Sequence, residues 1–167
     1  MQAFRESLLN MARYHHWATK LLLEHVQSVS EEDYRKDRGL FFKSIHGSLN
    51  HLLVAERIWW GRFYGQPYEV DGLDAEVESD RETLENDYMQ QAYQWESLVE
   101  SLSGEELLAS FDYQNTRNEA MSAVRGPILM HVFNHGTHHR GQISAALTQL
   151  GHEAPEMDLL YFLNPNA

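Results

Sequence analysis

The sequence predicts an all-α protein, a four-helix bundle with long connections between its helices. Four windows of about twenty residues or more repeat apolar side chains every three or four positions, and no repeated strand pattern interrupts them. The chain has 167 residues, of which 43% are hydrophobic, and this is enough for one domain with a substantial core. We therefore expect residues 1–167 to form a single helical domain.

The first predicted helix covers residues 4–29. Its apolar stripe includes Leu8 and Leu22, and no proline or glycine lies inside it. Ser30 then precedes three acidic residues, a pattern typical of a capped short turn. Residues 36–39 are charged and polar and end in glycine, which indicates a loop before the next helix.

The second and third predicted helices cover residues 44–64 and 80–102. The second is followed by Gly65, with Pro67 just beyond, and both residues are typical stop signals for a helix. Gly104 follows the third helix in the same way. The connection between the two helices is rich in glycine and aspartate, which indicates a loop.

Residues 105–125 are the least regular part of the chain. We expect a loop there with at most a pair of strands, and extended chain over residues 107–113. Pro127 suits the first position of a helix because that position needs no amide hydrogen, so the fourth helix is predicted over residues 127–150, before Gly151. Each connection between the long helices has about a dozen residues or more, so an up-down-up-down path is not required.

The composition excludes several classes of function. Thirteen Lys and Arg against 25 Asp and Glu give a formal net charge of −12, which repels nucleic-acid phosphates and anionic lipids. There is no cysteine, so nitrogen and oxygen must hold any metal. Charges interrupt every apolar run, which favours a cytoplasmic protein without a signal peptide or membrane span. We expect neither nucleic acid nor membrane as a partner.

The ten histidines are the most informative residues. Four of them lie on the fourth predicted helix, within a sector of about 100°: His131, His135, His138 and His139. Helical residues four apart have Cβ atoms about 6 Å apart, so two such imidazoles can bind one ion. Spacing alone permits both the pair His131 and His135 and the pair His135 and His139.

A chelating pair needs a third ligand from a facing helix. His46 and His51 lie on the second predicted helix, about 140° apart around its axis, so at most one of them points into the same seam. His51 is the better candidate because its face carries small and apolar residues such as Ala55 and Ile58. Three neutral nitrogens with a fourth position left to water are typical of a catalytic zinc site.

Other types of site are excluded by spacing. No glutamate has a histidine three residues later, which excludes the carboxylate-bridged di-iron bundle. The sequence also lacks the His-Glu-x-x-His protease pattern, the Cys-x-x-Cys-His haem pattern and a glycine-rich phosphate loop. The remaining histidines fit surface positions or hydrogen-bonded core positions: His15, His16, His25, His46 and His152.

Residues 131–143 (HVFNHGTHHRGQI) resemble the signature of the DinB family of DNA-damage-inducible proteins, part of the wider DinB/YfiT-like group of metalloenzymes. Residues 44–59 (SIHGSLNHLLVAERIW) and residues 14–18 (YHHWA) resemble the same family. The resemblance therefore covers three of the four predicted helices. One departure is Thr19, which stands where the family often has asparagine.

The resemblance implies a four-helix bundle that binds a divalent transition metal through His51, His135 and His139. His131 and His138 then become neighbours of the site. Zinc is the default metal for three histidines, and nickel, manganese and iron accept the same ligand type. Members of the wider group include transferases and isomerases that use low-molecular-weight thiols such as bacillithiol, mycothiol or glutathione, while many members have no assigned reaction.

Two classes of function follow from these expectations. The first is a metal-dependent enzyme for a small-molecule substrate, either a thiol-dependent transferase or a metal-dependent hydrolase. The second is a stress-associated metal-binding protein without turnover, and a purely structural bundle comes third. No catalytic acid or base is assigned. Apolar and aromatic side chains at Phe63, Tyr64, Tyr88 and Met89 lead us to expect a homodimer.

Overall fold

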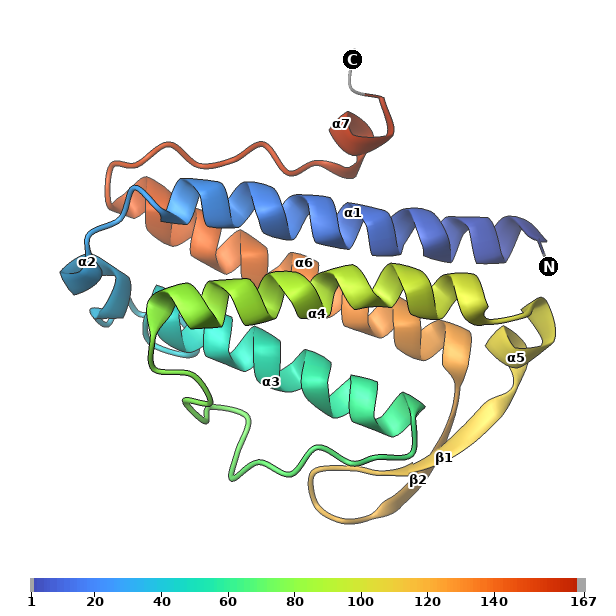
Figure 1. Cartoon of the computed structure of the whole chain (residues 1–167). Coiled ribbons are helices and arrows are strands. Elements are labelled where there is room, and N and C mark those ends of the chain that lie inside the picture. Colours follow the sequence, from blue (N-terminus) through green and yellow to red (C-terminus); the bar gives the residue numbers. More distant parts are fainter. Residues whose placement is uncertain (1, 165–167) are drawn as a thin grey trace.

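The computed structural model describes residues 2–164 and confirms the four-helix bundle (Figure 1). The bundle helices are α1 (Gln2–Val26), α3 (Ile45–Phe63), α4 (Arg81–Ser101) and α6 (Arg125–Gln149). The shorter elements are α2 (Glu31–Arg35), α5 (Gly104–Leu108), α7 (Leu159–Leu163), β1 (Ser110–Gln114) and β2 (Ala120–Val124). The four long helices begin and end within three residues of their predicted bounds.

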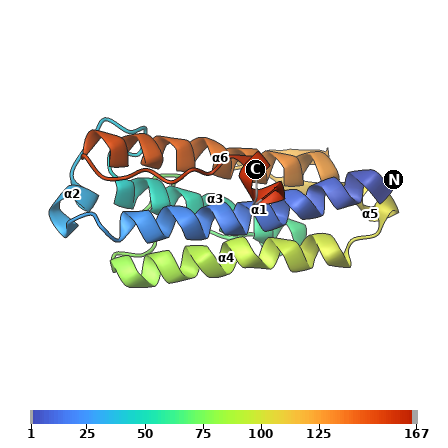
Figure 2. The same ribbon diagram turned by 90° about the horizontal axis from the view of Figure 1, so that it is seen from above.

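The four helices do not follow an up-down-up-down path. Helices α1 and α3 both pack against α4 and α6, so α1 lies diagonally across the bundle from α3. Figures 1 and 2 show that α1 and α6 run in one direction and that α3 and α4 run in the other. Because α3 and α4 are consecutive and parallel, residues 64–80 return along the length of the bundle before α4 begins.

Side-chain caps fix the starts of several helices. Ser44 Oγ accepts a hydrogen bond from the Gly47 amide, and the Asp80 carboxylate accepts one from the Thr83 amide. Ser30 caps α2, as its position before three acidic residues predicts. Helix α6 begins two residues before the predicted Pro127. A proline fits this third position too, because the first four amides of a helix have no acceptor inside it.

Residues 105–125 are more ordered than the sequence predicts. The expected strand pair is present: β1 and β2 are antiparallel, with Ser110 opposite Val124. The expectation of extended chain from residue 107 is wrong, because Leu107 is buried in the short helix α5 and β1 begins only at Ser110. At the turn, the side chain of Asn115 accepts hydrogen bonds from backbone amides and Asn118 adopts φ 61°.

The core fills the space between the four long helices in two apolar clusters. Tyr88 in one cluster and Trp95 in the other are completely buried. The burial of Tyr88 corrects the predicted dimer surface, because a side chain inside the bundle cannot contribute to an external face. No helix between residues 2 and 164 combines the length and the hydropathy that a membrane span requires.

Candidate metal centre

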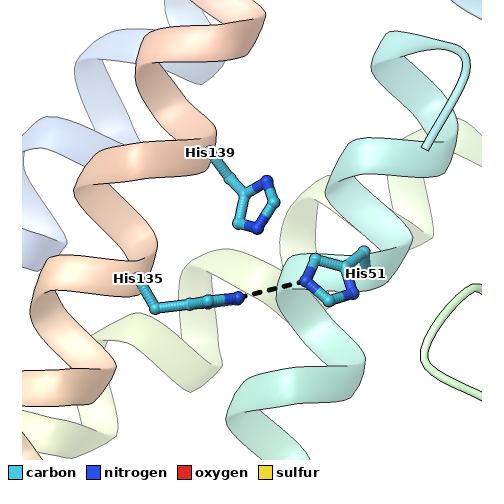
Figure 3. A group of neighbouring side chains, drawn as sticks. All are labelled: His51, His135 and His139. Carbon is cyan, nitrogen blue, oxygen red and sulfur yellow. Dashed lines mark hydrogen bonds between the residues drawn. The ribbon is translucent and has the colours of Figure 1, made fainter. Parts of the chain in front are cut away.

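Three histidines from two neighbouring helices converge at one edge of the bundle (Figure 3). His51 comes from α3, and His135 and His139 come from successive turns of α6. Each offers one ring nitrogen, and the three nitrogens lie within 4.8 Å of one another. His51 Nε2 and His135 Nε2 are 3.1 Å apart, close to the separation of about 3.3 Å between two nitrogens on one tetrahedral zinc ion.

Hydrogen bonds to Nδ1 orient two of the three rings. His51 Nδ1 lies 2.7 Å from the carbonyl oxygen of Leu73, which can only accept, so Nδ1 carries the proton and Nε2 keeps its lone pair. His139 Nδ1 likewise donates to Gln142 Oε1 at 2.8 Å. The Gln142 amide nitrogen donates in turn to His138 Nε2 at 3.1 Å, which fixes the orientation of the amide. Such outer hydrogen bonds are typical of metal-ligating histidines.

Burial keeps the three imidazoles neutral. Loss of solvation lowers the pKa of His51 to about 4 and that of His135 to about 3, and the neighbouring histidines lower the pKa of His135 further. Burial also lowers the pKa of His139. At neutral pH, lone pairs therefore face one another across a short gap, which is unfavourable unless a proton or a cation lies between them. This donor set fits a divalent transition metal.

Two loops enclose the cluster on the side of His51. The Phe42 ring stacks on the His51 ring, with centroids 3.7 Å apart and planes 15° apart. Gly47 permits this close approach, because a Cβ atom there would collide with the backbone oxygen of Phe42. Leu73, whose carbonyl accepts from His51, belongs to the segment that returns from α3 to α4.

The structure places the other candidate histidines next to the cluster or away from it. The ring of His131 lies 5.9 Å from that of His135 and contacts Trp59, and His138 is exposed beside Gln142. His46 points elsewhere and binds Glu76 at 2.9 Å. Of the pairs that spacing permits on α6, the structure thus brings His135 and His139, together with His51, to one point.

Sequence reasoning missed a buried charged network in the bundle interior. His15 Nε2 lies 2.8 Å from Glu56 Oε1, and Arg140 Nη1 lies 2.9 Å from His15 Nδ1. All three side chains are at most 2% exposed. Burial lowers the pKa of His15, so the neutral ring accepts a hydrogen bond from Arg140 and donates one to Glu56. The network therefore separates two opposite charges by one imidazole.

The network depends on Gly136, which lies between His135 and His139 on α6. A Cβ atom on Gly136 would lie 2.6 Å from His15 Cε1 and 2.9 Å from Arg140 Nη1. Thr19, the departure from the family pattern, is buried and accepts a hydrogen bond from Arg140 at 3.4 Å. A glycine inside a helix is the kind of sequence signal that can mark such close packing, but Gly141 in the same helix meets no atom within 4 Å.

The sequence profile of the DinB family matches residues 1–166. The chain belongs to the DinB family. Among characterised relatives, it is similar to protein DinB of Bacillus subtilis (strain 168), with 26% identity over 154 residues that cover 90% of each chain. This likeness extends over nearly the whole of both chains, so the family assignment concerns the complete bundle.

The bundle is also similar to the solved structure of YfiT from Bacillus subtilis. The TM-score is 0.67 and the identity 14%, over 89% of this chain and 90% of YfiT. YfiT is described as a probable metal-dependent hydrolase with an unusual four-helix bundle topology. At this identity the likeness establishes that the two proteins share a fold.

Proposed function

We propose that this DinB-family protein is a metal-dependent enzyme whose His51, His135 and His139 hold a divalent transition metal. The convergence of three ring nitrogens within 4.8 Å is the observation that carries the proposal. Zinc suits three imidazole ligands, and nickel, manganese and iron accept the same donors. Three protein ligands leave a coordination position for a small-molecule reactant, as in catalytic rather than structural sites.

A divalent metal at this position supplies a positive centre that lowers the pKa of a coordinated water or thiol. The three ligands are neutral, so they leave the full charge of the ion in place. The Leu73 carbonyl and the Gln142 amide hold two of the rings with Nε2 inward. Phe42 shields the His51 ring from water on one side.

Hydrolysis of a small molecule is one reaction that this site supports. The likeness to YfiT, described as a probable metal-dependent hydrolase, favours it. Activation of water needs a neighbouring group that accepts a proton, and His138 is the nearest histidine outside the cluster in the hydrogen-bond chain through Gln142.

Transfer of a low-molecular-weight thiol to an electrophile is the second candidate. Within residues 2–164, the hydrogen-bond partners of the three histidines outside the cluster are the neutral groups of Leu73 and Gln142, and no carboxylate is among them. A thiol has a lower pKa than water and therefore needs less help from a protein base once its pKa is lowered. This difference favours a thiol over water as the nucleophile.

Elemental analysis of protein purified without metal-affinity columns tests the proposal. We expect about one equivalent of transition metal per chain in the wild type, a large loss in His135→Ala, and retention in the control His152→Ala, which removes a histidine that is hydrogen-bonded to Ser28 and lies outside the cluster and its hydrogen-bond chain. Equal and negligible metal in all three proteins, without uptake of added zinc or nickel, would contradict it. Metal without turnover of thiol or hydrolysable substrates would favour a binding protein.

A further inference from the structure

Arg62 lies on the same face of α3 as His51. Eleven positions separate them, which corresponds to about 20° around the helix and about 16 Å along it. The guanidinium of Arg62 lies 4.4 Å from the centroid of the Trp59 ring and 4.9 Å from that of Tyr113 in β1. Two aromatic rings thus hold this cation in a defined place near the end of the helix.

The guanidinium of Arg62 differs from that of Arg57, five positions earlier on α3. Arg57 binds the carboxylate of Asp87 at 2.6 Å. Arg62 has no ion pair and no side-chain hydrogen bond with any residue between 2 and 164, and burial lowers its pKa while Tyr113 raises it. An arginine remains protonated despite such a shift, so this half-buried positive charge has no carboxylate within ion-pair distance among residues 2–164. Such a charge is costly unless a ligand anion pairs with it.

Arg62 also lines a cavity of about 810 Å³ between the return segment and the β-hairpin. This volume lies within the range of small-molecule sites. The cavity wall includes Ile58, which shares the face of His51, and Leu73, whose carbonyl binds His51. On the side of α6, Trp59 contacts His131, which lies beside His135. The cavity therefore runs from Arg62 to Leu73, the residue whose carbonyl holds the His51 ring.

We propose that Arg62, held by Trp59 and Tyr113, binds a carboxylate of the substrate while the reacting end of that substrate reaches the histidine cluster. This inference rests on the proposed function and names the class of substrate, a small molecule with a carboxylate several bonds away from its metal-binding group. The planar guanidinium suits a carboxylate because it can donate two parallel hydrogen bonds.

The charges around the cavity favour a carboxylate over a phosphate. Glu69, Asp71 and Asp112 line the same cavity, so a ligand with two negative charges is repelled more strongly than one with a single charge. The same carboxylates attract an ammonium group. The expected substrate is therefore zwitterionic, like an amino acid or a short peptide.

Binding of thiol peptides to the cobalt-loaded protein tests the proposal. The guanidinium of Arg62 folds back over the Trp59 ring, about 12 Å along α3 from His51. Cys-Gly-Gly spans about 10 Å when extended, and its cysteine side chain adds to this reach. Its thiol reports on the metal through a thiolate-to-cobalt absorption band, and its C-terminal amide form lacks only the carboxylate. We expect the wild type to bind the acid about tenfold more tightly than the amide.

Two variants decide whether Arg62 causes this preference. Arg62→Gln is expected to bind acid and amide equally well while the cobalt band is still formed. Arg57→Gln removes a paired arginine from the same helix and is expected to keep the tenfold preference. A wild type that does not distinguish acid from amide, or an Arg62→Gln variant that still does, overturns the proposal.

Two further measurements separate the remaining outcomes. If neither peptide produces the cobalt band in the wild type, the thiol form of the proposed function fails. Arg62 is then tested without metal, by calorimetry that compares the binding of Gly-Gly-Gly and of its C-terminal amide to the metal-free wild type and to the same two variants. Competition with acetate and inorganic phosphate tests the anion: displacement of Cys-Gly-Gly by phosphate at lower concentration than by acetate overturns the assignment to a carboxylate.

Discussion

His15 of α1 and the three-histidine cluster, which contact adjoining faces of α6, use their ring nitrogens differently. Both nitrogens of His15 have protein partners, Glu56 on one side and Arg140 on the other. In the cluster, the Nδ1 atoms of His51 and His139 bind groups outside it, and the Nε2 of His51 instead faces the Nε2 of His135 at 3.1 Å. A histidine with two protein partners supports the fold, whereas converging ring nitrogens are favourable only with a proton or a cation between them, which fits the proposed metal.

The two groups also differ in how many helices they join. The network joins all four long helices, because His15 lies on α1, Glu56 on α3 and Arg140 on α6, and Trp95 of α4 donates to Glu56 at 3.0 Å. The histidine cluster of the candidate metal centre joins α3 and α6. We therefore expect changes in the network to reduce the stability of the whole bundle and changes in the cluster to remove the metal while the fold remains.

The largest expected effect is that of Glu56→Gln. The amide removes the counter-charge of the buried Arg140 and presents a donor to His15 or Trp95, so we expect the free energy of unfolding to fall by about 3–5 kcal/mol in urea titrations. The control is Glu96→Gln, which breaks the exposed 2.6 Å pair with Arg13 and is expected to cost less than about 1 kcal/mol. Equal losses of unfolding free energy in both variants would show that the buried network contributes no more to stability than an exposed ion pair.

Added zinc is expected to have the next largest effect. Metal that binds only the folded protein raises its free energy of unfolding by about 2.7 kcal/mol at a hundred times the dissociation constant. His135→Ala is expected to lose this increase, whereas His152→Ala keeps it. The measurement is urea unfolding with and without zinc, and an increase that survives in His135→Ala would place the metal elsewhere.

Gly136 and Gly141 form a matched pair on α6. Alanine at 136 would press against His15 and Arg140, so we expect a loss of about 1–3 kcal/mol in thermal or urea unfolding. Alanine at 141 meets no atom within 4 Å and is expected to stabilise the helix by up to about 1 kcal/mol. If both variants change stability in the same direction, the close packing at Gly136 does not matter energetically.

A pH dependence of the metal-free protein is expected from the burial of the cluster. His51 and His135 have pKa values of about 4 and about 3 in the folded protein, whereas an unfolded histidine titrates near 6.5. The unfolded chain therefore binds more protons between these values, so stability is complete above pH 6.5 and falls as the pH decreases toward 4.

The double variant His51→Asn and His135→Asn isolates this pH dependence. Other histidines in the protein titrate too, so the comparison is the slope of urea midpoints between pH 7 and pH 5 with and without the two side chains. We expect a shallower slope in the double variant. Identical slopes would show that burial of the cluster does not perturb these two groups.

The sequence predicted the long helices and the shared face of the histidines on α6, because both follow from helical periodicity. Apolar spacing determines which face of each helix is buried, and the four-residue step between His135 and His139 places their rings on one side of α6. The choice between His131 and His139 as the partner of His135 depended on the family resemblance. In the structure, Trp59 occupies the space beside His131.

The buried network could not be predicted from the same kind of pattern. His15 and Arg140 are 125 positions apart in the chain, and neither shows from its neighbours that it meets the other. Isolated charges such as Glu56 on a helix are usually exposed, so nothing local marks this one as buried. The role of Leu73 was hidden for a related reason, because its backbone oxygen, rather than its side chain, binds His51.

The parallel arrangement of α3 and α4 makes the segment between them long, and this segment lines the candidate site. A bundle with antiparallel consecutive helices needs only a short loop between them, but here residues 64–80 must run back along the outside. That run provides Leu73 beside His51 and much of the cavity wall, including Tyr68 and Val70. Insertions or randomised sequences in residues 65–72 can therefore create new ligand preferences while the bundle core stays unchanged.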